Sequence, residues 1–154
     1  MIIKQYIKEF EKMGFGLFVH FGLYSIIGKG EWAKYSCSIV DEDYESKAKQ
    51  FIPELNWADN LARTAKETGC KYITLTTRHH DGFSLFDTCG LNDYDAPHNC
   101  GRDLVKEFVT ACRTYDIVPF FYHTLLDWRE KSYNTDFSAY LEYLRASVEI
   151  LCKN

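Results

Sequence analysis

Three short apolar runs along the chain each lead into side chains that can carry a proton or bind a hydroxyl group. They are residues 15–19, followed by His20; the apolar part of residues 71–82, followed by His79 and His80; and residues 117–121, followed by Tyr122 and His123. Continuous runs of β-branched and large apolar residues predict strands that are buried on both faces, as in a parallel sheet. Pro119 removes one backbone donor from the third run, which argues against a central position for that strand.

Between and after these runs, apolar residues recur at helical spacing. One helix is predicted to begin after Asn56, its N-cap, and to end at Gly69, and a second is predicted over residues 104–112. A third is predicted from about Thr135. The remaining predictions are an amphipathic lead-in over residues 1–12, a long polar loop after the first strand with a short helix at 43–50, and a loop at 83–101.

Strand and helix alternate three times, which predicts parallel strands joined by right-handed crossovers. Two architectures fit this order: a small doubly wound sheet, or part of a (β/α)₈ barrel. A dinucleotide site would need a glycine-rich turn directly after the first strand, but GKGEW at residues 28–32 is too far from Val19 and lacks the GxGxxG spacing. A complete barrel takes roughly 250 residues. The 154 residues are therefore expected to form one incomplete domain, residues 1–154.

The carboxyl ends of parallel strands meet at one edge of a sheet, and α/β proteins place their chemistry there. The strand-end residues expected to line one pocket are His20, His79, His80, Tyr122 and His123. The long loop after the first strand carries a carboxylate and an indole, Glu31 and Trp32, between glycines.

Composition and charge narrow the class of partner. A net charge of −4 without a run of Lys or Arg argues against nucleic acid or an anionic membrane, and favours a neutral small ligand. The six cysteines form no CxxC pair and are expected to be reduced thiols. No segment is apolar enough to span a bilayer, and the first twelve residues lack a signal-peptide core, so a cytoplasmic location is predicted.

Five motifs occur in order between residues 14 and 128: GLFVHFGLYS, GEW, KYITLTTRHHDGFSLFD, RDLVKEFVTACR and FFYHTLLDW. This series resembles the glycoside hydrolase family 29 α-L-fucosidases, and HHDGF is its most specific piece. The resemblance implies an α/β fold, the N-terminal portion of a (β/α)₈ TIM-like barrel with about three βα units and parallel strands. Phe21 stands where the family commonly has Trp, and His123 where Ser is frequent, which bears on fine specificity.

The resemblance also implies a site and a ligand. The family's fucose contacts correspond to His20, Glu31, Trp32, His79, His80 and Tyr122, with a fucosylated oligosaccharide or glycoconjugate as partner and no cofactor. The family's nucleophile and acid/base correspond to positions beyond Asn154. Retaining hydrolysis needs two carboxylates about 5 Å apart. The parent enzyme is therefore expected to release terminal α-L-fucose with retention, and this chain, without a catalytic residue, to be inactive alone. Its unfinished barrel is expected to self-associate.

Two other functions stay open. The chain could be a noncatalytic fucose-binding remnant, or belong to a metal-dependent barrel hydrolase whose ligands would be His20, His79, His80 and Asp81. Adjacent histidines on a regular strand face opposite sides, which argues against a simple chelate. Structural roles also stay open for the predicted site residues: a backbone bond for His20, a solvated loop position for Glu31, and packing for Trp32 and Tyr122.

Overall fold

The computed structural model describes residues 4–153, and its centre is a parallel sheet of three strands in the order β1-β2-β3. The strands are β1 (Gly16–Val19), β2 (Tyr72–Arg78) and β3 (Val118–His123). β2 pairs in parallel with both neighbours, with Phe18, Thr74 and Phe120 in register across the sheet. The predicted parallel α/β order is confirmed, and the sheet is open rather than closed into a barrel.

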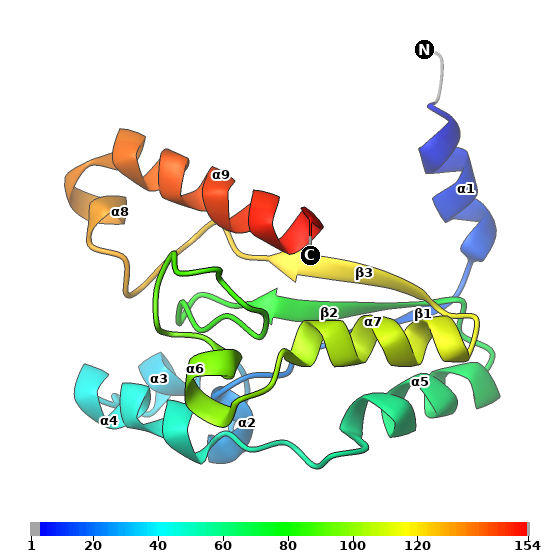
Figure 1. Ribbon diagram of the computed structural model, residues 1–154, viewed down its shortest axis with the longest axis horizontal. Coiled ribbons are helices and arrows are strands. Elements are labelled where there is room, and N and C mark those ends of the chain that lie inside the picture. The colour runs from blue at the N-terminus through cyan, green and yellow to red at the C-terminus, as the bar shows by residue number, and fades with distance from the viewer. Residues whose placement is uncertain (1–3, 154) are drawn as a thin grey trace.

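Helices surround this sheet on three sides (Figure 1). The longer ones are α1 (Gln5–Met13), α5 (Trp57–Glu67), α7 (Leu104–Thr114) and α9 (Phe137–Lys153). The short ones are α2 (Tyr24–Ile27), α3 (Ala33–Ser36), α4 (Asp41–Glu45), the 3₁₀ helix η1 (Ser46–Gln50), α6 (Ala96–Cys100) and α8 (Ser132–Thr135). In Figure 1 α1 lies beyond the strand starts, whereas α2, α3, α4 and α6 gather toward the end to which the strands point.

The hydrophobic core lies between one face of the sheet and helices α5 and α7. Ile73 and Leu75 of β2 are fully buried in one cluster with Ala62 of α5 and Phe108 of α7. The face of α5 that enters this cluster carries three buried alanines, whose small side chains let the helix approach closely. Side chains alternate along a strand, so Tyr72, Thr74 and Thr76 face the other way, into what would be the interior of a barrel.

That inner face is covered only in part. Tyr72 and Thr74 are half-buried and Phe18 is 54 % exposed, which corrects the expectation of strands buried on both faces. The physical reason is that the open sheet of the described chain has no strands opposite this face. Near the strand starts, Phe10 of α1 packs against Tyr72 and Phe120, with ring centroids 5.4 and 5.6 Å away.

Pro119 is tolerated because β3 lies at an edge of the sheet. Val118 N donates to Lys71 O, so the nitrogen of the next residue, Pro119, points away from β2. The missing N–H therefore removes no ladder bond with β2, in agreement with the expectation that a proline avoids central strands.

Two of the helix-end predictions have different outcomes. Gly69 follows α5 with φ +84°, and its N–H bonds to Lys66 O, as expected for a terminating glycine. Asn56 does occupy the position before α5, but its side chain makes no capping hydrogen bond. Asp103 is the N-cap of α7 and accepts from Lys106 N at 2.8 Å.

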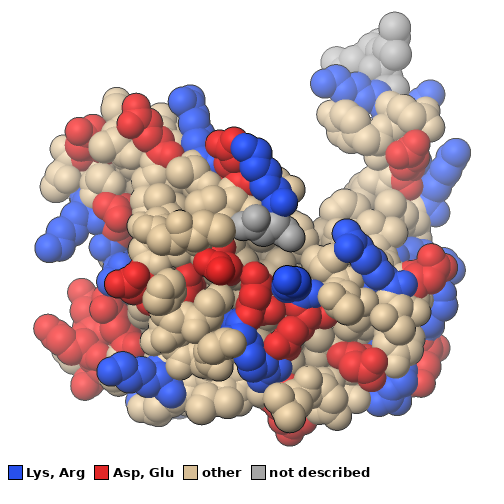
Figure 2. Space-filling model, viewed as in Figure 1, with Lys and Arg blue, Asp and Glu red and all other residues tan. Residues whose placement is uncertain are grey.

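The surface mixes both signs of charge. Figure 2 shows acidic and basic side chains interspersed on the face in view, with α1 standing off from the body of the molecule. Cys70 and Cys112 are buried free thiols, and Cys37 and Cys152 are exposed ones. Among the helices described, none is long and apolar enough to cross a membrane.

Candidate functional site

The ends of the three strands bring four of the predicted site residues together. The ring of His79 lies 5.5 Å from His20, 4.2 Å from His80 and 5.9 Å from Tyr122, measured between centroids. His20 follows β1, the two adjacent histidines follow β2, and Tyr122 lies near the end of β3. His79 is buried and His20 is exposed. Residues about 100 positions apart in the sequence therefore share one edge of the sheet.

The loop after β1 returns to this edge and contributes the other two predicted residues. Trp32, which directly precedes α3, places its ring 5.4 Å from His80. The carboxylate of Glu31 lies close enough to favour the charged forms of His79 and His80, and so raises the pKa of each against a larger opposing effect of burial. All six predicted residues thus lie in one region, while their role in binding a ligand stays a prediction.

Trp128 also belongs to this cluster, although from the sequence it was expected only to order the loop after the third strand and was left outside the predicted site. Its ring lies 5.3 Å from that of His80 and 5.1 Å from that of Trp32, and its backbone N–H donates to His80 O at 2.8 Å. Tyr24 is a second addition, with its ring 5.4 Å from that of His79. The position of Trp128 shortly after the third strand was the only available signal.

A sharp turn after β2 lets two adjacent histidines reach the same site. β2 ends at Arg78, so His79 and His80 lie outside the regular strand, where adjacent side chains need not face opposite ways. Asp81 fastens the turn: Oδ1 accepts from Phe83 N at 3.1 Å and Oδ2 accepts from the Tyr44 hydroxyl at 2.8 Å. Burial raises the pKa of the Asp81 carboxyl above its usual range. Its contacts show Asp81 capping a turn.

A buried ion pair fixes the loop that carries Trp128. The Nη2 of Arg78 donates to Oδ2 of Asp127, and both side chains are almost wholly buried. Oδ1 of Asp127 accepts from the backbone N–H groups of Arg129 and Glu130, both at 2.9 Å, while Arg78 Nε donates to Gly82 O at 3.3 Å. One ion pair therefore ties the turn after β2 to the loop after β3.

Burial favours the neutral forms of His79 and His80. Burial, with the nearby His80 and His20, lowers the pKa of His79 to about 4, and burial also lowers the pKa of His80. The Thr124 hydroxyl donates to Leu126 O at 2.8 Å, so it accepts from Nδ1 of His80, 2.5 Å away. This assignment leaves Nε2 of His80 as a hydrogen-bond acceptor. Nδ1 of His79 is buried without a hydrogen-bond partner in the described chain.

Such a cluster is suited to binding a polar ring compound. Neutral imidazoles donate and accept hydrogen bonds with hydroxyl groups, and indole and phenol rings offer flat apolar faces. Of the nearby carboxylates, Asp81 is held by Tyr44 and Asp127 by Arg78, which leaves Glu31 available to a ligand. Within residues 4–153, no three His, Cys, Asp or Glu side chains converge as metal ligands would.

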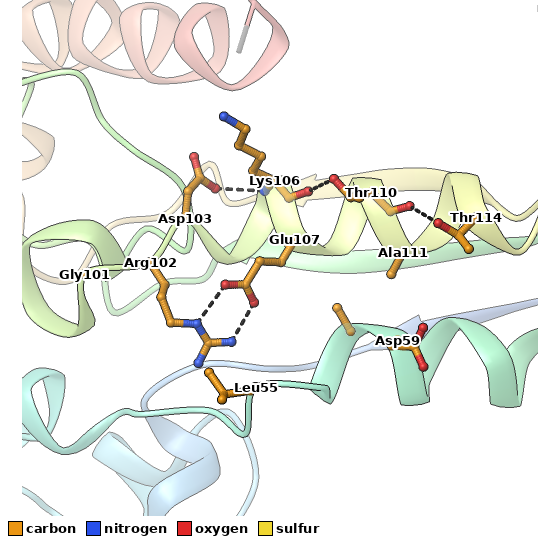
Figure 3. Close-up of a pocket in the computed structure, with 11 residues that line it drawn as sticks. Leu55, Asp59, Gly101, Arg102, Asp103, Lys106, Glu107, Thr110, Ala111 and Thr114 are labelled. Carbon is orange, nitrogen blue, oxygen red and sulfur yellow. Dashed lines mark hydrogen bonds and ion pairs between the residues drawn. The ribbon is translucent and has the colours of Figure 1, made fainter.

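Another cavity lies away from the strand ends, in the groove between α5 and α7 (Figure 3). It measures about 650 Å³, and its charged residues are Asp59, Arg102, Asp103, Lys106 and Glu107. Arg102 is already satisfied by Glu107 and by the Pro53 carbonyl, and Asp103 caps α7. Arg102, Asp103 and Glu107 of this groove already stabilise the fold through these bonds. We therefore place the candidate site at the strand ends.

Comparison with known proteins identifies the family. The family model described as "Alpha-L-fucosidase" matches residues 3–145. The tissue alpha-L-fucosidase of Bos taurus is 32% identical over 148 residues, a match covering 82% of this chain and 31% of that protein. An alpha-L-fucosidase of Dictyostelium discoideum is 25% identical over 150 residues, with 82% and 32% covered. The chain thus spans about a third of the length of these curated relatives.

Solved structures agree with this match. A GH29 alpha-L-fucosidase from Bacteroides thetaiotaomicron superposes with a TM-score of 0.89 at 28% identity, covering 97% of this chain and 38% of that one. Alpha-L-fucosidase isoenzyme 1 from Paenibacillus thiaminolyticus superposes with a TM-score of 0.88 at 35% identity, covering 97% of this chain and 40% of that one. The open three-stranded sheet corresponds to the N-terminal part of their barrel domain, as the resemblance implied. The chain therefore belongs to the alpha-L-fucosidase family, glycoside hydrolase family 29.

Proposed function

We propose that this chain forms the wall of an α-L-fucosidase active site that recognises the fucose. The observation that carries the proposal is the convergence of His20, His79, His80 and Tyr122 at the strand ends. Trp32 extends this group through its contact with His80. A fucosylated oligosaccharide or glycoconjugate is the corresponding ligand.

Each group has a role that suits a deoxyhexose. The free Nε2 of His80 accepts a hydrogen bond from a sugar hydroxyl, and the Glu31 carboxylate can accept two. The face of Trp32 packs on the apolar side of the ring, where the methyl group of fucose adds apolar area. Neutral imidazoles at His79 and His80 are appropriate because the ligand carries no charge.

We propose further that the 154-residue chain, taken as a single partial domain, releases no fucose alone. Retaining hydrolysis needs a carboxylate nucleophile and an acid/base about 5 Å apart. By the family resemblance both correspond to positions beyond Asn154. The parent enzyme would use them to cleave terminal α-L-fucosides with retention. A noncatalytic fucose-binding remnant remains the second candidate, because the same wall would serve it.

Binding can be measured through the indole N–H signals in ¹⁵N NMR spectra, because the chain has three tryptophans. Two of them, Trp32 and Trp128, lie in the site, and the indole N–H of the third, Trp57, is bound to Glu107 in the groove beside α7. Addition of L-fucose is expected to shift the signals of the first two and to leave that of Trp57 unchanged. Its enantiomer D-fucose is the matched control.

Equal shifts with both enantiomers, or none with L-fucose, would overturn the proposed binding. His79→Phe is expected to weaken L-fucose binding at least tenfold, a loss of about 1.4 kcal/mol. Fucose released from an aryl α-L-fucoside by the purified chain would contradict the proposed inactivity while leaving the binding site intact.

The cytoplasmic location stays a prediction from the sequence. Fractionation of the source cells, with detection of this chain in the cytosolic or the exported fraction, would decide it.

A further inference from the structure

His80 has one ring nitrogen bonded within the protein and one that the described chain leaves without a hydrogen bond. Nδ1 lies 2.5 Å from the hydroxyl oxygen of Thr124, whereas no group within residues 4–153 bonds to Nε2. The Thr124 side chain is fully buried and His80 is half-buried. Nε2 is therefore the nitrogen of this ring that a ligand can meet.

The Thr124 side chain is held firmly beside the ring. Its backbone N–H donates to Arg78 O at 3.0 Å, and its hydroxyl oxygen lies 2.8 Å from Leu126 O and 3.2 Å from Leu126 N. A β-branched threonine also has few side-chain rotamers open to it. The position of the hydroxyl is therefore set by the loop after β3, and the His80 ring has to adapt to it.

The direction of the bond between Thr124 and His80 follows from these partners. A hydroxyl group has one proton, and the Leu126 carbonyl can only accept, so the Thr124 proton lies on that contact. The Thr124 oxygen then accepts from Leu126 N–H and from Nδ1 of His80, which must itself carry a proton. Burial lowers the pKa of His80, and a neutral imidazole holds a single ring N–H, so Nε2 is left with a lone pair.

The opposite orientation of the His80 ring does not fit. A flip of the imidazole would put a ring carbon in place of Nδ1, about 2.5 Å from the Thr124 oxygen. Even a close C–H···O contact has its carbon roughly 3.3–3.6 Å from the oxygen. The Leu126 carbonyl gives a second indication, because it acts to raise the pKa of His80 against the larger effect of burial, as an acceptor facing an imidazole N–H does.

From this geometry we propose that Thr124 is a positioning residue, which fixes the tautomer of His80 and thereby requires the ligand to donate a hydrogen bond to Nε2. A sugar hydroxyl meets this requirement, whereas fluorine in the same place can only accept. The requirement on fucose rests on the proposed function. The tautomer does not, because the contacts that set it lie within the chain.

The first test determines the tautomer without any ligand. In ¹⁵N NMR spectra at pH 7, the His80 ring is expected to show a protonated Nδ1 and an unprotonated Nε2. Thr124→Ser, which keeps the hydroxyl, should preserve this pattern. Thr124→Val, which keeps the shape and removes the hydroxyl, should move the proton toward Nε2.

Thr77→Val is the matched control for this substitution. The Thr77 hydroxyl is also fully buried and donates to a carbonyl of β3, Tyr122 O, at 2.9 Å, but it does not contact His80. Its loss should leave the His80 tautomer unchanged. A proton on Nε2 in the unchanged chain, or the same tautomer in Thr124→Val, would overturn the proposal. The spectrum of the unchanged chain tests the tautomer even if Thr124→Val does not fold.

The second test compares methyl α-L-fucoside with its three analogues in which fluorine replaces the hydroxyl group at C2, C3 or C4. Binding is followed by the indole signal of Trp128. At least one analogue is expected to bind roughly five- to tenfold more weakly, because Nε2 is left without a donor. In Thr124→Val the penalty of that analogue should fall below about threefold, since an Nε2–H group can face fluorine. Thr77→Val should keep the penalty in full.

The outcomes separate this inference from the proposed function. If no fluorine substitution weakens binding, or if Thr124→Val keeps every penalty after its tautomer has changed, the requirement for a donor is wrong. If methyl α-L-fucoside does not bind at all, that requirement falls with the proposed function, and the ¹⁵N spectra still decide whether Thr124 sets the tautomer.

Discussion

His79 and His123 are two buried histidines with different uses. Burial is the main cause that lowers the pKa of each to about 4. Both ring nitrogens of His123 have partners, Thr124 O at 2.9 Å and Ser147 Oγ at 2.8 Å, so this histidine ties β3 to α9. His79 instead lies among the rings of the site. Of the two, only His79 is placed to meet a ligand.

These pKa values predict that the chain loses stability in mild acid. Between pH 6.5, the ordinary histidine value, and about 4, the unfolded chain binds protons that the folded chain does not, so stability falls as pH falls. From pH 7 to pH 5 each histidine should lower the free energy of unfolding by roughly 1–2 kcal/mol. Urea unfolding at both pH values measures the loss.

His123→Gln is the informative variant, because it removes one of these titrations. Whatever its effect on stability at pH 7, its loss between pH 7 and pH 5 should be smaller than that of the unchanged chain by roughly 1–2 kcal/mol. An unchanged loss, or a His123 pKa near 6.5 by NMR titration, would contradict the prediction.

Local sequence patterns position the site residues that could be predicted, whereas a long-range contact positions the one that was missed. His20, His79 and Tyr122 were predictable because they lie at or just past the ends of apolar runs, and parallel pairing then brings the ends together. Trp128 could not be predicted as a site residue, because its place depends on the ion pair between Asp127 and Arg78, 49 residues earlier. A contact of that range leaves no local pattern in the sequence.

At the scale of elements, the long helices could be predicted from the sequence and the short ones could not. The helices at α5, α7 and α9 show several turns of apolar spacing and were predicted, although α9 begins at Phe137, after the separate short helix α8. Helices α2, α3 and α6 have four or five residues, little more than one turn, and so lie unseen in segments expected to be loops. The short helix expected at 43–50 is two elements, α4 and η1.

The N-terminal caps of α7 and α5 differ, so substitutions at the two caps give a prediction with its own control. Asp103 accepts from Lys106 N at the start of α7 and also from Asp87 N at 3.2 Å, whereas the Asn56 side chain makes no such bond at α5. Asp103→Ala is expected to lower the free energy of unfolding by about 1–2 kcal/mol, and Asn56→Ala by less than about 0.5 kcal/mol. Urea unfolding followed by circular dichroism measures both. Equal losses would mean that the observed caps do not set the stability of these helices.

At the scale of the molecule, the open sheet leaves apolar side chains uncovered. Phe18 is 54 % exposed on the inner face, and β1 and β3 each pair with only one neighbour within the described chain. The sequence could predict an incomplete barrel from the number of strand–helix units, but not how far the inner face would be covered. That depends on α1, whose packing over the strand starts is a tertiary contact.

We expect the isolated chain to self-associate through this inner face. Burial of a phenylalanine contributes about 1.5–3 kcal/mol, so Phe18→Ser should weaken self-association roughly tenfold or more. Sedimentation over a range of concentrations measures it. Phe137→Ser, at a position that is 56 % exposed on α9, is the matched control and should have no effect. Equal weakening by both variants would place the contact elsewhere.

Tyr72 packs where β1 has Gly16, and the fit is so close that a Cβ at that glycine would lie 2.5 Å from the phenol ring. With Phe10 and Phe120, Tyr72 builds an aromatic floor at the strand starts, opposite the histidine-bearing end. This floor has no room for one more methyl group at Gly16. Gly16→Ala would press that methyl against the phenol ring, so Tyr72 or the start of β1 would have to move.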